Sequence, residues 1–175
     1  MEKASSNQLK IAIIGPESSG KSTLCEQLSR HFSASWVPEF ARSYLETIPN
    51  YSRHDLDYFL GQQIANEKKD HASILFCDTD PISFKIWSIY KYGTVSKYIN
   101  YVISSHNNYA HRILLTPDLP YEKDPLRENS SLKQRIELFE LFKQELEFHN
   151  LSYSIVDGLN ENRKKNAIKT LSKLI

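Results

Sequence analysis

Gly15-Pro16-Glu17-Ser18-Ser19-Gly20-Lys21-Ser22 is the stretch that decides the fold of this chain. It matches the pattern G-x-x-x-x-G-K-[ST], in which a glycine-rich turn joins a buried strand to a helix. Residues 9–14, directly before it, are a largely apolar run without polar alternation, which predicts a strand covered on both faces. Residues 22–32, directly after it, carry apolar side chains at helical spacing. The motif therefore stands in the context that its chemistry requires.

The chemistry of such a loop is phosphate binding, because its backbone N–H groups and the following helix N-terminus form a cradle for phosphate oxygens. Lys21 is expected to bridge the β- and γ-phosphates and Thr23 to reach the α-phosphate, while the Ser22 hydroxyl is offered to Mg²⁺. ATP and Mg²⁺ are the expected cofactors. The loop residues predicted to bind the nucleotide are Gly15, Glu17, Ser18, Ser19, Gly20, Lys21, Ser22 and Thr23.

Short apolar runs alternate with segments of helical spacing along the whole chain. Beyond residues 9–14, strands are predicted at residues 35–37, 74–77, 113–115 and 153–156, and further helices at residues 55–71, at residues 132–149 and after Asn160. This alternation predicts an α/β fold, the three-layer P-loop nucleoside triphosphate hydrolase fold, with a parallel sheet of about five strands. We expect a polar tail at residues 1–8, a single P-loop kinase domain at residues 9–175, and a lid segment at about residues 117–131.

A second Mg²⁺ ligand is expected from a carboxylate at the end of a neighbouring buried strand. Asp78 follows the apolar residues 74–77 and is the natural candidate, so Ser22 and Asp78 are the predicted metal residues. Asp80 lies two residues further on, where the ligands of an α/β sheet collect. The alternative for both aspartates is that they cap the helix beginning near Pro81.

The loop alone does not fix the reaction, because GTPases, motor ATPases and small-molecule kinases share it. The chain contains neither N-K-x-D nor D-x-x-G, the guanine-reading and switch motifs of GTPases, and it is short for a motor ATPase. Instead, Glu39 and Arg42 follow the second predicted strand, and Arg127 and Arg135 lie in or beside the lid segment. An acid for an acceptor hydroxyl and arginines over the phosphoryl group favour a kinase. The alternative from another class is an NTP-binding regulatory module.

At these residues the chain resembles the ribosylnicotinamide kinase domain of the NadR family, over nearly its whole length. Residues 15–23 look like the family's G-x-E-S-S-G-K-S loop, and residues 38–42 look like its acid-aromatic-small-arginine segment. D-T-D at residues 78–80, with Trp87 and Tyr90 after it, resembles the family's D-T-D segment and aromatic helix.

Two further segments carry the resemblance. Residues 118–127 look like the lid motif D-x-P-W-x-x-D-G-x-R, with Tyr121 in place of the tryptophan and Pro125 in place of the glycine. Asp157-Gly158, with Arg163, falls where such kinases turn around the adenine.

The resemblance implies ATP-dependent phosphorylation of ribosylnicotinamide to nicotinamide mononucleotide in NAD salvage; the alternative is a kinase of another nucleoside or nucleotide. The implied catalytic residues are Lys21, Asp78, Asp80 and Arg127. Arg127 and Gly158 join the nucleotide-binding set. The implied substrate-binding residues are Trp36, Glu39, Phe40, Arg42, Asp80, Trp87 and Asp118. Among the carboxylates, Asp78 is expected on the metal and Glu39 or Asp80 on the riboside.

Composition limits the partners. With 22 Lys and Arg against 21 Asp and Glu, the net charge is +1, which gives no electrostatic footprint for nucleic acid. The apolar runs are far shorter than a membrane helix, and the short polar N-terminus lacks the features of a signal peptide. We therefore expect a cytoplasmic protein with a small-molecule nucleoside substrate, no nucleic acid and no membrane. Cys25 and Cys77 are predicted to be structural thiols.

Overall fold

The computed structural model describes residues 8–106, 108–123, 125–128 and 131–175. The strands of this part of the chain are β1 (Leu9–Ile14), β2 (Ser35–Val37), β3 (Ile74–Asp78), β4 (His111–Leu115) and β5 (Tyr153–Val156). Its helices are α1 (Lys21–His31), α2 (Phe40–Thr47), α3 (Arg53–Lys69), α4 (Pro81–Tyr92), α5 (Lys97–Ser105), α6 (Leu132–Phe148) and α7 (Glu161–Leu171).

The strands form one parallel sheet in the order β2-β3-β1-β4-β5. β1 lies at its centre, with Ile11 opposite Phe76 of β3 on one side and His111 of β4 on the other. This position explains why β1 is apolar on both faces, since helices cover the sheet from both directions. The α/β fold and the five-stranded parallel sheet expected from the sequence are confirmed.

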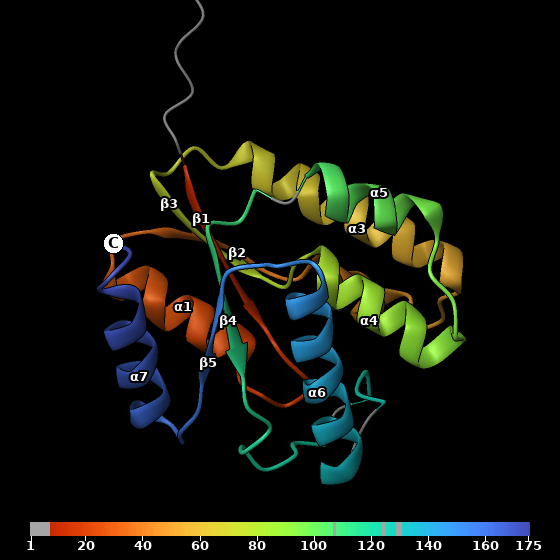
Figure 1. The fold of residues 1–175 in the computed structure, drawn as a ribbon. Helices are drawn as coiled ribbons and strands as arrows, with labels where there is room; N and C mark the ends of the chain where they lie inside the picture. The colour runs from red at the N-terminus through yellow and green to blue at the C-terminus, as the bar shows by residue number, and fades with distance from the viewer. Residues whose placement is uncertain (1–7, 107, 124, 129–130) are drawn as a thin grey trace, which may run out of the picture.

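Helices cover the sheet on both faces and complete three layers (Figure 1). On one face, Ile11 and Ile13 of β1 pack with apolar residues of α1 and α7. On the other face, Ala12 and Ile14 belong to a larger core built with α2, α3, α4, α5 and α6. Alternate residues of a single strand therefore serve two separate cores.

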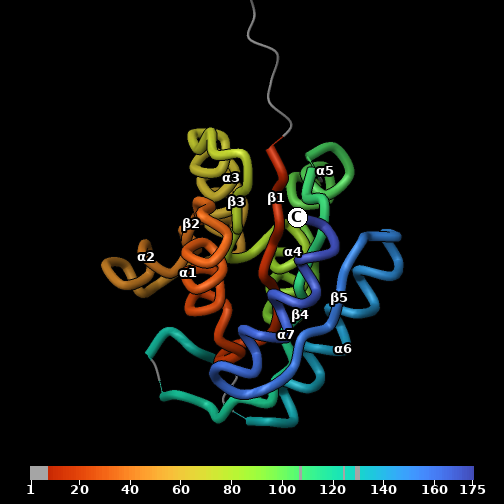
Figure 2. The backbone as a smooth tube through the Cα atoms, turned by 90° about the vertical axis from the view of Figure 1, so that its left-hand side faces the viewer, coloured from red at the N-terminus to blue at the C-terminus, as the bar shows by residue number. Residues whose placement is uncertain are grey.

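The carboxyl ends of the strands gather at one edge of the sheet, and the connection between β4 and α6 runs beneath them (Figure 2). The connection after β1 leads to α1 on one face, whereas the connection after the neighbouring β3 leads to α4 on the other. Connections that diverge in this way leave a crevice between two strand ends, which is where ligands bind in open α/β sheets.

The structure adds two helices to those expected from the sequence. The helices α2 and α5 were not predicted. α2 is short, with eight residues, and α5 is capped by Ser96, whose hydroxyl accepts a hydrogen bond from the Ile99 N–H. Residues 1–7 of the expected tail and residues 124, 129 and 130 of the lid segment lie outside the described residues. Cys25 and Cys77 are free and buried, as predicted. In the described ranges, every helix is too short or too polar to cross a bilayer.

Candidate functional site

A cavity of ≈ 690 Å³ opens at the crevice beyond the strand ends. The loop of residues 15–20 and the first turn of α1 form its floor, and α2 and α4 form one wall. Further lining comes from the apolar side chains of Leu138 and Phe142 on α6 and from six residues of the lid segment: Leu119, Pro120, Glu122, Leu126, Arg127 and Glu128. The size suits a small molecule with most of its surface buried.

The loop of residues 15–20 needs glycine at its two ends. Gly15 has φ of +143°, and a Cβ there would lie 2.9 Å from the Leu115 carbonyl oxygen. Gly20, with φ of +81°, is the residue from which α1 starts. The loop curls around Lys21, whose ammonium donates hydrogen bonds to the carbonyl oxygens of Gly15 and Pro16, each at 3.1 Å. The cation is thus held at the centre of the loop.

Ser22 and Asp78 meet across the crevice, as the sequence led us to expect. The Ser22 hydroxyl donates a 2.5 Å hydrogen bond to Asp78 Oδ2, while Asp78 Oδ1 has no hydrogen-bond partner among the described residues. Asp78 is 1% exposed, and its burial raises the pKa of the carboxyl, against the lowering effects of Lys21 and Ser22.

A hydroxyl beside a carboxylate with one unpartnered oxygen fits Mg²⁺, which prefers oxygen ligands and commonly takes few of them from protein. Within the described ranges there is no group of three or more His, Cys, Asp and Glu side chains that could hold a metal by themselves. The remaining ligands of such an ion would therefore be phosphate oxygens and water.

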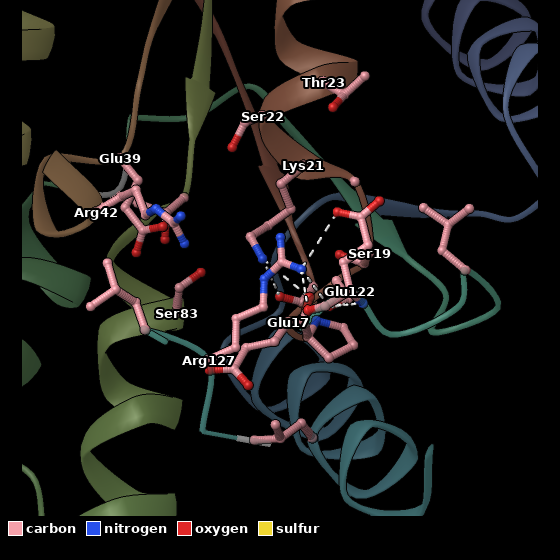
Figure 3. A pocket seen from close by; sticks show the side chains of 18 of the residues that line it. Glu17, Ser19, Lys21, Ser22, Thr23, Glu39, Arg42, Ser83, Glu122 and Arg127 are labelled. Atoms are coloured by element: carbon pink, nitrogen blue, oxygen red, sulfur yellow. Dashed lines mark hydrogen bonds and ion pairs between the residues drawn. The ribbon is translucent and has the colours of Figure 1, made fainter. Parts of the chain in front are cut away.

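Glu39 lies on the cavity wall at the N-terminus of α2, facing the same crevice. Burial, together with the negative charge of Asp78, raises the pKa of its carboxyl to about 7, although Lys21 and Arg42 act in the opposite direction. The side chains of Glu39 and Arg42 lie beside Ser83, across the cavity from the loop (Figure 3). A carboxyl group that titrates near neutral pH can both accept and release a proton under ordinary conditions.

Arg127 of the lid segment reaches the loop from the opposite side. Its Nη1 donates hydrogen bonds to Ser18 Oγ at 3.0 Å and to the Glu122 carbonyl oxygen at 2.8 Å. The Glu128 N–H donates to the Glu17 carboxylate at 3.1 Å, so a second contact joins lid and loop. Figure 3 shows Arg127 and Lys21 extending into the same space from different elements. Two cations converge there, which is a favourable place for an anion.

Two residues of the cavity wall, Tyr51 and Lys91, were not predicted from the sequence. Trp87 of α4 donates its indole N–H to the Tyr51 hydroxyl at 2.9 Å, and Tyr51 in turn donates to the Glu128 carboxylate at 2.8 Å. Lys91 donates to the same two groups, at 2.6 Å and 2.5 Å. Tyr90 also lines the cavity. Lys91 follows Trp87 by one helical turn, a signal that could have found it, whereas Tyr51 stands outside any motif.

Two aromatic residues expected at the substrate lie elsewhere. Trp36 of β2 packs on the face of the sheet covered by α1, in the core that contains Phe76. Phe40 joins an aromatic cluster with Tyr44 and Tyr58, and neither Trp36 nor Phe40 lines the cavity. The strand alternation that points Val37 into one core directs Trp36 toward the other, which corrects the expectation for Trp36.

Asp80 takes the role that the sequence left open as its alternative, the cap of the helix that follows it. It is fully buried, and its Oδ1 accepts hydrogen bonds from the Ser83 N–H and hydroxyl, while its Oδ2 forms a 2.7 Å ion pair with Arg112. Asp80 therefore caps α4 and anchors that helix to β4, and this placement does not fit an expectation of substrate binding or catalysis.

Asp118, Gly158 and Arg135 serve the framework around the loop. Asp118 forms an ion pair with Arg163 and accepts a hydrogen bond from the Gly158 N–H at 2.7 Å, and its expected contact with substrate stays a prediction. Arg135 is 4% exposed and donates to the Leu119 carbonyl oxygen at 2.8 Å, so it supports the lid segment and is not an exposed helix charge.

Comparison with known proteins agrees with this geometry. The family model described as "AAA domain" matches residues 10–163. The trifunctional NAD biosynthesis/regulator protein NadR of Escherichia coli (strain K12) is 30% identical over 155 residues, which are 84% of this chain and 38% of that protein. The chain thus spans well under half of this curated relative.

Solved structures show the same fold. NadR protein in complex with NR has a TM-score of 0.74 at 18% identity, and NadR protein in complex with NAD and AMP-PNP has 0.73 at 19%. Each match covers 95% of this chain, with 50% and 49% of the respective NadR chain. Thymidylate kinase from Ehrlichia chaffeensis has a TM-score of 0.67 at 12% identity, covering 96% of this chain and 99% of that one. The fold is that of P-loop kinases.

Proposed function

Since the chain belongs to the AAA domain family over residues 10–163, we propose that it is a kinase that transfers the γ-phosphoryl group of ATP to the 5′-hydroxyl of ribosylnicotinamide. The product would be nicotinamide mononucleotide. The coarser part of this proposal, a nucleotide-dependent small-molecule kinase, has the broadest support, because the fold neighbours include NadR and a nucleotide kinase.

The observation that carries the proposal is that one cavity brings together groups suited to ATP, to Mg²⁺ and to an acceptor hydroxyl. Lys21 and Arg127 extend into the same space, where they suit the phosphates of ATP. The Ser22–Asp78 pair suits Mg²⁺, and the carboxyl of Glu39, whose pKa lies at about 7, suits the proton of an acceptor hydroxyl. Phosphoryl transfer needs cations for the charge of the transferring group and a group that positions the nucleophile.

In the proposed reaction, the acceptor oxygen forms a bond to the γ-phosphorus while the bond from that phosphorus to the β–γ bridging oxygen breaks. Lys21 and Arg127 stabilise the charge on the transferring group and on the departing ADP. Glu39 receives the proton of the acceptor hydroxyl, a role for which its raised pKa is suitable. When bound between Ser22 and Asp78, Mg²⁺ would neutralise phosphate charge. The lid residues that line the cavity, among them Leu119, Pro120 and Leu126, would shield the reacting groups from water.

The choice of ribosylnicotinamide rests on the NadR resemblance and on the aromatic wall. A nicotinamide ring is flat and cationic, and Trp87 and Tyr90 offer ring surfaces at the cavity wall, a suitable partner for such a group. Sequence identity of 30% to NadR over 155 residues supports the same choice.

The test is ATP-dependent phosphorylation of a panel of acceptors, with ADP release and phosphorylated product both measured. The panel contains ribosylnicotinamide, purine and pyrimidine nucleosides, and nucleoside monophosphates. We expect the highest kcat/KM with ribosylnicotinamide. A preference for another acceptor would keep the kinase and replace its substrate, whereas ATP binding with no phosphorylated product for any acceptor would favour a regulatory module.

A further inference from the structure

Arg163 of α7 is a buried cation that phosphoryl transfer does not itself require. Its side chain is 4% exposed, and α7 lies beside α1 on the face of the sheet away from the acceptor wall (Figure 1). Burying a guanidinium is costly unless its donors are satisfied, so its contacts indicate what it is for.

The guanidinium of Arg163 joins three separate segments of the chain. Nη1 donates a 2.5 Å hydrogen bond to the carbonyl oxygen of Ser19, inside the phosphate-binding loop. Nε donates to the Gly158 carbonyl oxygen at 2.8 Å, and both terminal nitrogens reach the Thr116 carbonyl oxygen at 3.3 Å. Asp118 completes the set as the anionic partner of Arg163.

The surroundings are shaped to hold this guanidinium in one orientation. The Asp118 carboxylate that pairs with Arg163 also accepts the Gly158 N–H at 2.7 Å, so both groups of Gly158 are fixed. Gly158 has φ of +102°, and a Cβ there would lie 3.2 Å from the Arg163 backbone nitrogen. The planar guanidinium of an arginine, with its several N–H donors, can bond all of these acceptors at once. The ammonium of a lysine would reach only some of them.

The contact with Ser19 has a consequence for the loop. In a trans peptide, the C=O and the following N–H point in opposite directions, and the described residues contain no cis peptide. A Ser19 carbonyl directed to Arg163 therefore directs the Gly20 N–H away from Arg163. Backbone N–H groups of such a loop are what bind phosphate oxygens.

We propose that Arg163 is a positioning residue for the triphosphate, which fixes the Ser19–Gly20 peptide so that the Gly20 N–H faces the phosphates without Arg163 touching them. This inference rests on the proposed function for its ligand, ATP. Burial lowers the pKa of Arg163 to about 10, so the group keeps its charge at neutral pH.

The experiment uses the full chain and measures dissociation constants for ATP, inorganic triphosphate and adenosine, with KM for the acceptor and the melting temperature. The variants are Arg163→Ala, Arg163→Lys and Asp118→Asn, with Lys164→Ala as the control. Lys164 is the next residue of α7, and its side chain is 31% exposed. Wild-type binding of ATP, measured first, tests the proposed function separately.

In Arg163→Ala we expect the dissociation constants for ATP and inorganic triphosphate to rise about tenfold, as for loss of one hydrogen bond to a charged group. Arg163→Lys should recover part of the affinity. Asp118→Asn, at a side chain that is 34% exposed, keeps the test possible if Arg163→Ala does not fold, and should show a smaller rise in the same two constants. Adenosine affinity, acceptor KM and the Lys164→Ala control should stay at wild-type values.

Three results would overturn the inference. Unchanged triphosphate affinity in a folded Arg163→Ala protein would remove Arg163 from phosphate binding. Loss of adenosine affinity with triphosphate affinity retained would make Arg163 a contact of the base. A loss shared equally by ATP, adenosine and the acceptor, in proportion to a lowered melting temperature, would assign it to stability alone.

Discussion

Replacing Glu39 with Gln should stabilise the folded protein at about pH 8 and should abolish most phosphoryl transfer. Burial of the Glu39 carboxyl and the nearby negative charge of Asp78 both disfavour its ionised form, and its pKa rises from 4.5 to about 7. Ionising it in the folded protein therefore costs free energy that ionising it in the unfolded chain does not. The amide of glutamine has the same shape and cannot ionise.

The sign and size of the effect follow from proton linkage. Between pH 4.5 and about 7 the folded state holds a proton that the unfolded state has lost, so the free energy of unfolding falls as pH rises through this window. The full rise in pKa corresponds to about 3 kcal/mol. Because Glu39 is half-buried, solvent screens part of this, and we expect about 1–2 kcal/mol.

The assay is urea denaturation of wild type and Glu39→Gln at about pH 4.5 and about pH 8, together with kcat at the higher pH. The variant should be more stable than wild type at pH 8, with the difference shrinking toward zero at pH 4.5. Ser43→Ala, on the same helix at an exposed side chain that does not ionise, is the control, and its effect should be alike at both pH values. A pH-independent difference for Glu39→Gln would refute the linkage, and unimpaired kcat would remove Glu39 from proton transfer.

Substitutions at three other positions test the remaining parts of the site. Lys21→Ala should fold normally, because the ammonium contacts loop carbonyls and not a core, but its kcat should fall by several orders of magnitude; near-normal turnover would show that the loop is not catalytic. Asp78→Asn should weaken the Mg²⁺ dependence and the rate together, and an unchanged Mg²⁺ activation curve would place the metal contact elsewhere. Arg127→Ala should lower kcat by about 10³ with little change in acceptor KM, since arginines over a phosphoryl group act mainly on the transition state, and Arg127→Lys should recover only part. A pure KM effect would make Arg127 a ground-state binding residue.

The central architecture could be predicted because local pattern and tertiary position agree there. Residues 9–14 are largely apolar because β1 lies mid-sheet, and the loop after it follows from glycine spacing. The Ser22–Asp78 contact could also be expected, because strand ends of a parallel sheet meet at one edge.

The errors arose where a side chain's partner lies far away in sequence. Asp80 and Arg112 are 32 residues apart, and nothing local to Asp80 reveals that β4 supplies a buried cation. Trp36 was expected at the substrate because of its chemistry, but strand alternation decides which face it occupies. Tyr51 reaches the site only because α4 and the lid segment converge on it.

The lid segment has a kinetic consequence. Its contacts with Ser18 and Glu17 involve partly or fully exposed groups, and so does the attachment of Glu128 to Lys91 and Tyr51. Interactions of this kind contribute little free energy individually, so the segment can open while the sheet and its two cores stay folded. We predict that release of product through this opening, and not bond cleavage, limits turnover. Added viscogen should then slow kcat in proportion to solvent viscosity, and a kcat independent of viscosity would contradict this prediction.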